Sequence, residues 1–117
     1  MTEFVRAALI SELREGGLKK VTVNTTPLLL AKVRGQIYAT DVSCPHLQAD
    51  LSEGVLQETL LTCPLHNSQF DIRDGHIVRW TDLKGIVLTH ATKARPPRPL
   101  RCYPVRIEGD TVLVGMP

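Results

Sequence analysis

Long hydrophobic runs, aromatic residues and a strong net charge are all scarce in this sequence. The apolar run Leu28–Ala31 is far shorter than the ~18 residues that a membrane-spanning helix requires. Aromatic residues make up only 4% of the chain, which leaves few rings on which nucleic-acid bases could stack. The formal net charge is only +2. We therefore expect neither a membrane protein nor a nucleic-acid-binding protein.

The chain is also short, and its first residues carry no sign of export. Its 117 residues are 43% hydrophobic, enough for one compact domain, which we expect to span residues 1–117. Glu3 and Arg6 flank a short apolar stretch, so no secretory hydrophobic region is present there. These features predict a cytoplasmic protein, taken to be a monomer, and are unlike those of a large enzyme with several centres.

Charge is distributed unevenly along the chain. Four cations and no anion lie between Lys93 and Arg101, whereas the stretch from Asp50 to Asp74 has five carboxylates and the single cation Arg73. This asymmetry could form a dipolar docking surface. The simpler interpretation is a solvated basic loop that is stiffened by its prolines.

Short apolar or alternating segments, separated by turn residues about every ten positions, indicate an all-β protein with many short strands. We expect strands at residues 4–8, 20–23, 27–33, 36–41, 60–62, 69–71, 76–79, 100–107 and 111–114. Turns that contain Gly at 33–36, 73–76 and 108–111 predict hairpins. A single helical turn within 10–15, capped by Ser11, is the most helix expected, because two glycines follow it.

Two of the three cysteines lie beside histidines, in the segments Cys44-Pro45-His46 and Cys63-Pro64-Leu65-His66. Two such short loops can hold one metal centre from opposite sides. A structural zinc site is one possibility, but its usual pattern places both cysteines on one knuckle and both histidines on a helix. The mixed pairing instead suits a two-iron cluster in which thiolates bind one iron and imidazoles bind the other.

At these residues the sequence strongly resembles the Rieske-type ferredoxins. Residues 41–54 (DVSCPHLQADLSEG) are similar to the first cluster loop of the family, and residues 63–75 (CPLHNSQFDIRDG) to the second loop and its hairpin. Residues 99–114 (PLRCYPVRIEGDTVLV) are similar to its closing hairpin. The resemblance implies a Rieske iron–sulfur domain. Its fold is an antiparallel β-sandwich with a two-loop cluster-binding subdomain, the loops lying at about 41–54 and 62–75.

The same resemblance implies a cofactor and its ligands. One Rieske-type [2Fe–2S] cluster per chain would be held by Cys44, His46, Cys63 and His66. Such a cluster is neutral when oxidised and carries one negative charge when reduced. Ser68 stands where the family often has a serine whose hydroxyl points at a cluster sulfide, and an ordinary turn hydroxyl is the alternative.

The loops also depart from the family pattern. Gln48 and Asn67 stand where glycine is common, and asparagine tolerates a positive φ better than glutamine does. The extra cysteine pair of the respiratory Rieske proteins is replaced by Ala49 and Leu65. A respiratory, membrane-anchored role is therefore not expected.

The remaining reactive side chains have simpler interpretations. Cys102 lies in an alternating segment and is expected to be a small buried hydrophobe. His76 and His90 are expected to face solvent, and Trp80 to pack against the domain.

The function implied by the resemblance is electron transfer, not catalysis by this chain alone. A Rieske ferredoxin carries single electrons from a flavin-dependent reductase to a terminal oxygenase in dioxygenase systems. Two alternatives are the small Rieske-type subunit of an assimilatory nitrite reductase and a zinc-stabilised structural or interaction domain. The sequence shows no acid–base pair, nucleophile or phosphate loop that would favour an enzyme.

Overall fold

The computed structural model describes residues 3–45, 49–64, 67–80 and 98–117, and within them every strand pairing is antiparallel. One sheet contains β1 (Glu3–Leu9), β11 (Thr111–Met116) and β10 (Val105–Glu108), in that order. A second contains β2 (Leu18–Val23), β3 (Thr26–Val33), β4 (Gln36–Asp41) and β9 (Cys102–Tyr103). A third contains β5 (Val55–Gln57), β6 (Leu60–Thr62), β7 (Gln69–Asp71) and β8 (Ile77–Arg79).

Strand β3 lies between two hydrophobic cores, which explains its continuous apolar sequence. Leu28 and Leu30 belong to a core shared with the β1–β11–β10 sheet, whereas Leu29, Ala31 and Val33 belong to a core shared with the β5–β8 sheet. Successive side chains of a strand point to opposite faces, so a strand covered on both faces needs apolar residues throughout. The sheet of β2, β3, β4 and β9 is thus the middle layer of the molecule.

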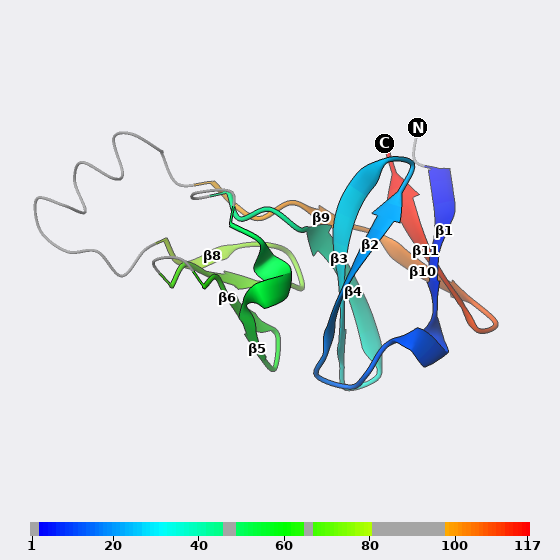
Figure 1. Ribbon diagram of the computed structural model, residues 1–117, viewed down its shortest axis with the longest axis horizontal. Helices are drawn as coiled ribbons and strands as arrows, with labels where there is room; N and C mark the ends of the chain where they lie inside the picture. Colours follow the sequence, from blue (N-terminus) through cyan, green and yellow to red (C-terminus); the bar gives the residue numbers. More distant parts are fainter. Residues whose placement is uncertain (1–2, 46–48, 65–66, 81–97) are drawn as a thin grey trace, which may run out of the picture.

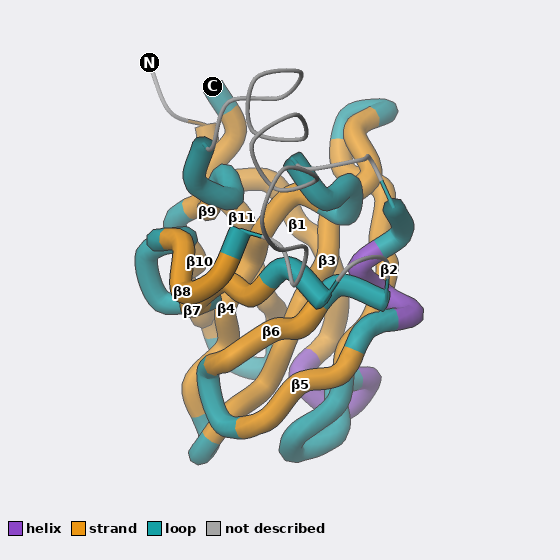
Figure 2. The backbone as a smooth tube through the Cα atoms, turned by 90° about the vertical axis from the view of Figure 1, so that its left-hand side faces the viewer, coloured by secondary structure: helices purple, strands orange, loops and turns teal. Residues whose placement is uncertain are grey.

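The molecule has two parts. We call the sheets β1-β11-β10 and β2-β3-β4-β9 the base, and the sheet of β5 to β8 with η2 (Leu51–Glu53) the tip. In Figure 1 the first two sheets form the right-hand part, and β5 to β8 form the left-hand part with η2 beside them. Figure 2 views the molecule from that left-hand side, so that β5 and β6 lie in front of β3 and β4. The described residues 49–54 and 67–75, which belong to the two segments expected to form cluster loops, therefore lie in the tip.

The all-β antiparallel prediction is confirmed, with four local differences. The expected strand at 100–107 is divided into β9 and β10, which join different sheets on either side of Pro104, a residue with no backbone N–H to donate. Strand β5 was not predicted, and neither was η2, a helical turn beyond the single one expected within 10–15. The short helix is the 3-10 turn η1 (Ile10–Glu12), and the Glu12 carboxylate, not Ser11, caps it by accepting from the Leu9 N–H at 2.8 Å. No helix in the described ranges is long and apolar enough to cross a membrane.

Candidate metal centre

Cys44 and Cys63 occupy matched positions in two loops of similar construction. The Cys44 N–H donates to the carbonyl oxygen of Ala49 at 2.9 Å, and the Cys63 N–H donates to the carbonyl oxygen of Ser68 at 2.7 Å. Each cysteine therefore begins a short loop that is closed by a hydrogen bond to the residue five positions later. Cys44 follows β4 and Cys63 follows β6, so each loop is anchored on a strand.

Both thiols lie inside the hydrophobic core between the middle sheet and the β5–β8 sheet. Cys44 is 0% exposed and Cys63 is 1% exposed, and they share one hydrophobic cluster with Leu51, Phe70 and Ile72. No disulfide joins any of the three cysteines, Cys44, Cys63 and Cys102. Two buried thiolates in apolar surroundings are unfavourable unless a metal neutralises their charge, and metal binding then also stabilises the fold.

This donor set fits the thiolate side of a Rieske cluster. The two imidazole candidates, His46 and His66, lie outside the described residues, inside the segments that the two hydrogen bonds close. Within the described ranges no group of three or more His, Cys, Asp and Glu side chains gathers as a metal site. Since half of the expected ligands fall outside those ranges, this result does not conflict with the assignment.

Ser68 is fully buried, and its hydroxyl donates to the backbone carbonyl of Trp80. A hydroxyl has only one proton to donate, so this bond directs it to the backbone at the end of β8. Trp80 is 8% exposed, and its ring packs edge-on against Phe70, with ring centroids 6.4 Å apart. The expectation that Trp80 packs against the domain is confirmed.

Asn67 adopts the left-handed backbone conformation that its position requires. Its φ is +54°, a region in which asparagine is tolerated better than most residues. The Arg79 side chain crosses from β8, and its Nε donates to the Asn67 carbonyl oxygen at 3.1 Å. Arg79 therefore supports the backbone directly after His66. Gln48, the other departure from the common glycine pattern, lies outside the described residues.

An ion pair that sequence reasoning missed joins the first cluster loop to the middle sheet. The Lys20 ammonium on β2 donates to Asp50 Oδ2 at 2.6 Å. Asp50 Oδ1 accepts from the N–H and the hydroxyl of Ser52, which caps η2. The Lys20 hydrogen bond, followed by that of the Ser52 hydroxyl, lowers the pKa of Asp50 to about 2. The spacing Asp50-x-Ser52 is a local capping signal, but nothing local indicates Lys20.

Gly75 sets the approach of the 98–101 segment to the second loop. Its φ is +83°, and the Leu100 carbonyl oxygen lies only 1.8 Å from where a Cβ would be. The Leu100 N–H donates to the Gly75 carbonyl oxygen at 2.9 Å, and Leu100 is 2% exposed. Only glycine permits this contact between two segments that lie far apart in the sequence.

Two other reactive side chains in the described part of the chain, Cys102 and His76, have local explanations. Cys102 is half-buried in β9, and burial, followed by the charge of Asp74, raises the pKa of its thiol to about 11. Such a thiol is a poor metal ligand. His76 is exposed and its Nδ1 lies 2.6 Å from Asp74 Oδ1, which confirms the expected solvent-facing position. His90 lies outside the described residues.

Similarity to known proteins agrees with the donor set. Residues 3–104 match the model of the Rieske [2Fe–2S] domain family. The chain is 35% identical over 117 residues to the ferredoxin component of the naphthalene 1,2-dioxygenase system of Pseudomonas aeruginosa, a match that covers 99% of each chain.

Two solved structures have the same fold over nearly the whole chain. The Sphingomonas yanoikuyae B1 ferredoxin matches 98% of this chain and 100% of its own, with a TM-score of 0.77 and 26% identity. A chain from the complex of reduced oxygenase and oxidised ferredoxin in carbazole 1,9a-dioxygenase matches 95% of this chain and 91% of its own, with a TM-score of 0.73 and 26% identity.

Proposed function

Because the chain belongs to the Rieske [2Fe–2S] domain family, we propose that it is a one-electron carrier between a flavin-dependent reductase and a terminal oxygenase. Its whole-length similarity to a ferredoxin component of a dioxygenase system supports this role, as does its similarity to a chain from an oxygenase–ferredoxin complex. The structural observation that carries the proposal is the burial of Cys44 and Cys63 at matched positions in two loops.

The proposed cluster ligands are the thiolates of Cys44 and Cys63 and the imidazoles of His46 and His66. When bound, the cluster supplies reversible one-electron chemistry. The chain positions the two thiols through the loop-closing hydrogen bonds and surrounds them with apolar side chains that exclude water. Residues 1–117 would act as one Rieske domain with cluster loops at about 41–54 and 62–75.

The alternative functions are less well supported. Relatives that match the full length are named as ferredoxin components, which favours a separate carrier over a nitrite reductase subunit. Membership of an iron–sulfur family argues against a zinc-stabilised domain. A cytoplasmic location completes the proposal and is supported by the full-length similarity to ferredoxin components of dioxygenase systems.

Electron transfer between purified proteins tests this function. The protein would be reduced with dithionite, freed of excess reductant and mixed without oxygen with the oxidised terminal oxygenase of a naphthalene 1,2-dioxygenase system. We expect about one electron per chain to pass to the oxygenase. Cys44→Ser should transfer none, whereas Cys102→Ala should behave as the wild type. A cluster-loaded, reduced protein that delivers no electron would contradict the proposed function.

A further inference from the structure

A basic surface lies directly beside one proposed cluster ligand. A cavity of about 280 Å³ opens between the Cys44 loop and the 98–101 segment. Cys44 itself lines this cavity, together with Asp41 on one wall and Arg98 and Arg101 on the other. Both arginines are exposed. We refer to Arg98, Arg101 and the mouth of this cavity as the arginine surface.

The backbone that carries the two arginines is anchored to its neighbours, and the Arg101 side chain also contacts a ring. Between them, Leu100 is buried and its N–H is bonded to Gly75. The Arg101 carbonyl oxygen accepts from the Asp41 N–H at 2.9 Å, and the Arg101 guanidinium carbon lies 5.1 Å from the centre of the Tyr103 ring. A cation that is already oriented loses less freedom when it binds an anion.

The arginine surface has an excess of positive charge. It has two cations and one carboxylate, Asp41, whose Oδ1 already accepts from the Tyr103 hydroxyl at 2.6 Å. The ion pairs found among the described residues involve neither Arg98 nor Arg101. In those ion pairs the carboxylates bind other cations, which include Lys19, Lys20, Arg34, Arg73 and Arg106.

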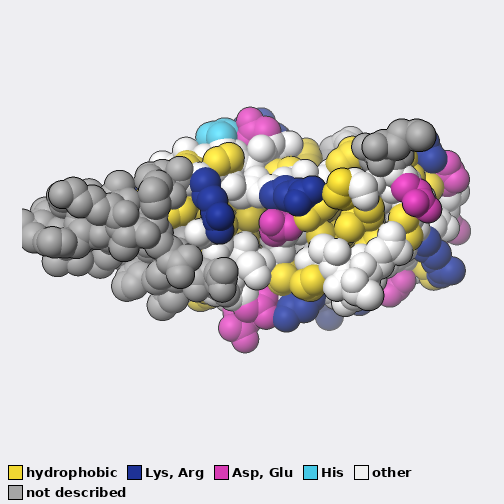
Figure 3. All heavy atoms as spheres, turned by 90° about the horizontal axis from the view of Figure 1, so that it is seen from above, with side chains coloured by type: hydrophobic (Ala, Val, Ile, Leu, Met, Phe, Trp, Pro, Cys, Tyr) yellow, Lys and Arg dark blue, Asp and Glu magenta, His cyan; other side chains and the backbone are white. Residues whose placement is uncertain are grey.

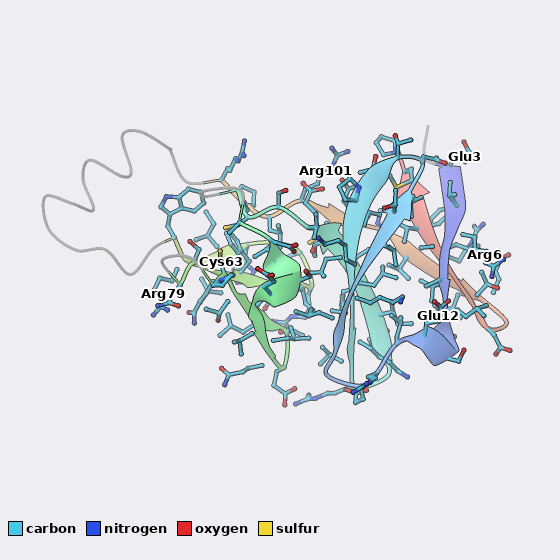
Figure 4. All side chains as sticks on the ribbon, in the orientation of Figure 1. Glu3, Arg6, Glu12, Cys63, Arg79 and Arg101 are labelled. Carbon is cyan, nitrogen blue, oxygen red and sulfur yellow. The ribbon has the colours of Figure 1, made fainter. Side chains whose placement is uncertain are left out.

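The position of this charge along the molecule is also informative. In Figure 4 Arg101 lies on the upper face between the tip, where Cys63 is labelled, and the base, where Glu3, Arg6 and Glu12 are labelled. Figure 3 looks down on this upper face and shows basic side chains on it, close to the tip. A partner bound there would lie against the loop that begins at Cys44, one of the proposed cluster ligands.

We propose that the arginine surface docks an acidic face of the partner that accepts the electron, the terminal oxygenase, whose Asp and Glu carboxylates bind the Arg98 and Arg101 guanidinium groups. This inference rests on the proposed carrier function. Within the docked pair one electron leaves the reduced cluster and reduces the partner's acceptor by one electron, and no proton or covalent bond is exchanged. The arginines also offset the negative charge of the reduced cluster, which would otherwise repel an acidic partner.

Small redox probes can measure the charge of this surface without an identified partner. The reduced protein would be oxidised in a stopped-flow instrument by ferricyanide, a one-electron anionic oxidant, or by tris(phenanthroline)cobalt(III), a one-electron cationic oxidant. In the variant Arg98→Gln/Arg101→Gln we expect the ferricyanide rate at low ionic strength to fall by roughly 5- to 10-fold and the cobalt rate to rise. High salt should remove most of the difference.

Two further variants separate charge from other effects. Arg6→Gln removes one positive charge at the far end of the molecule and should leave both rates close to wild type. Arg98→Lys/Arg101→Lys keeps the charge and should keep the ferricyanide rate. An unchanged ferricyanide rate in the glutamine variant would overturn the proposal, as would equal decreases with both probes, because these indicate an altered driving force.

The outcome also distinguishes this proposal from the carrier function. If the wild-type protein contains no cluster that can be reduced, the carrier function itself fails. If it exchanges electrons with both probes at rates that do not depend on Arg98 and Arg101, the carrier function stands and the docking surface is wrong.

Discussion

Replacement of Gly75 by alanine should damage the fold far more than the same change at another glycine with a positive φ. An alanine Cβ at residue 75 would lie 1.8 Å from the Leu100 carbonyl oxygen and 3.2 Å from the Cys102 sulfur. The left-handed backbone costs alanine about 1–2 kcal/mol. The contact with Leu100 must also break, which removes a hydrogen bond of about 0.5–1.5 kcal/mol and exposes a leucine whose burial contributes about 1.5–3 kcal/mol.

Gly35→Ala is the matched control. Gly35 has a φ of +77°, but nothing lies within 4 Å of its missing Cβ, so only the backbone cost of about 1–2 kcal/mol applies there. We expect Gly75→Ala to be less stable than wild type by about 3–6 kcal/mol, a fall of ~12–24 °C in the thermal midpoint measured by circular dichroism at equal cluster content. Equal midpoints for the two variants would refute the close packing of Gly75 against Leu100.

Three further changes test the surroundings of the metal centre. Asp50→Asn should lower the urea midpoint at pH 7. The pKa of Asp50 is about 2 in the folded protein and ~3.9 in an unfolded chain. The difference in urea midpoint between wild type and Asp50→Asn should therefore have its full value at pH 5 and begin to decrease near pH 4. A difference that does not change with pH would contradict this. Ser68→Ala should lower the thermal midpoint and leave the reduction potential close to that of the wild type, because the hydroxyl donates to the Trp80 carbonyl. A fall in potential at unchanged stability, seen by voltammetry, would instead place the hydroxyl at the cluster. Cys102→Ala should retain its iron and visible spectrum, and loss of either would make this thiol a ligand.

The ligand pattern and most strands could be predicted because their signals are local. Each proposed pair of ligands lies within four consecutive residues, and the hairpins at Gly35 and Gly109 follow directly from their turn sequences. The positive φ at Asn67 also follows from comparison with the common glycine pattern. Such features depend on neighbouring residues and need no knowledge of the tertiary fold.

The features that were missed depend on contacts between distant segments. Lys20 and Asp50 are 30 positions apart, and neither residue indicates the other in the sequence. The close approach of Gly75 to Leu100 likewise exists only once the tip has assembled. The change of sheet at Pro104 is also non-local, because β9 pairs with β4 and β10 pairs with β11. The course of the 98–101 segment, and hence the arginine surface, could not be derived from composition.

Iron and acid-labile sulfide analysis of the native protein, purified without air, tests the central claim most directly. The account predicts about two irons and about two sulfides per chain, as in a Rieske [2Fe–2S] centre, and predicts that Cys44→Ser and Cys63→Ser lose both. Stoichiometric zinc with no sulfide in the wild-type protein would contradict the account.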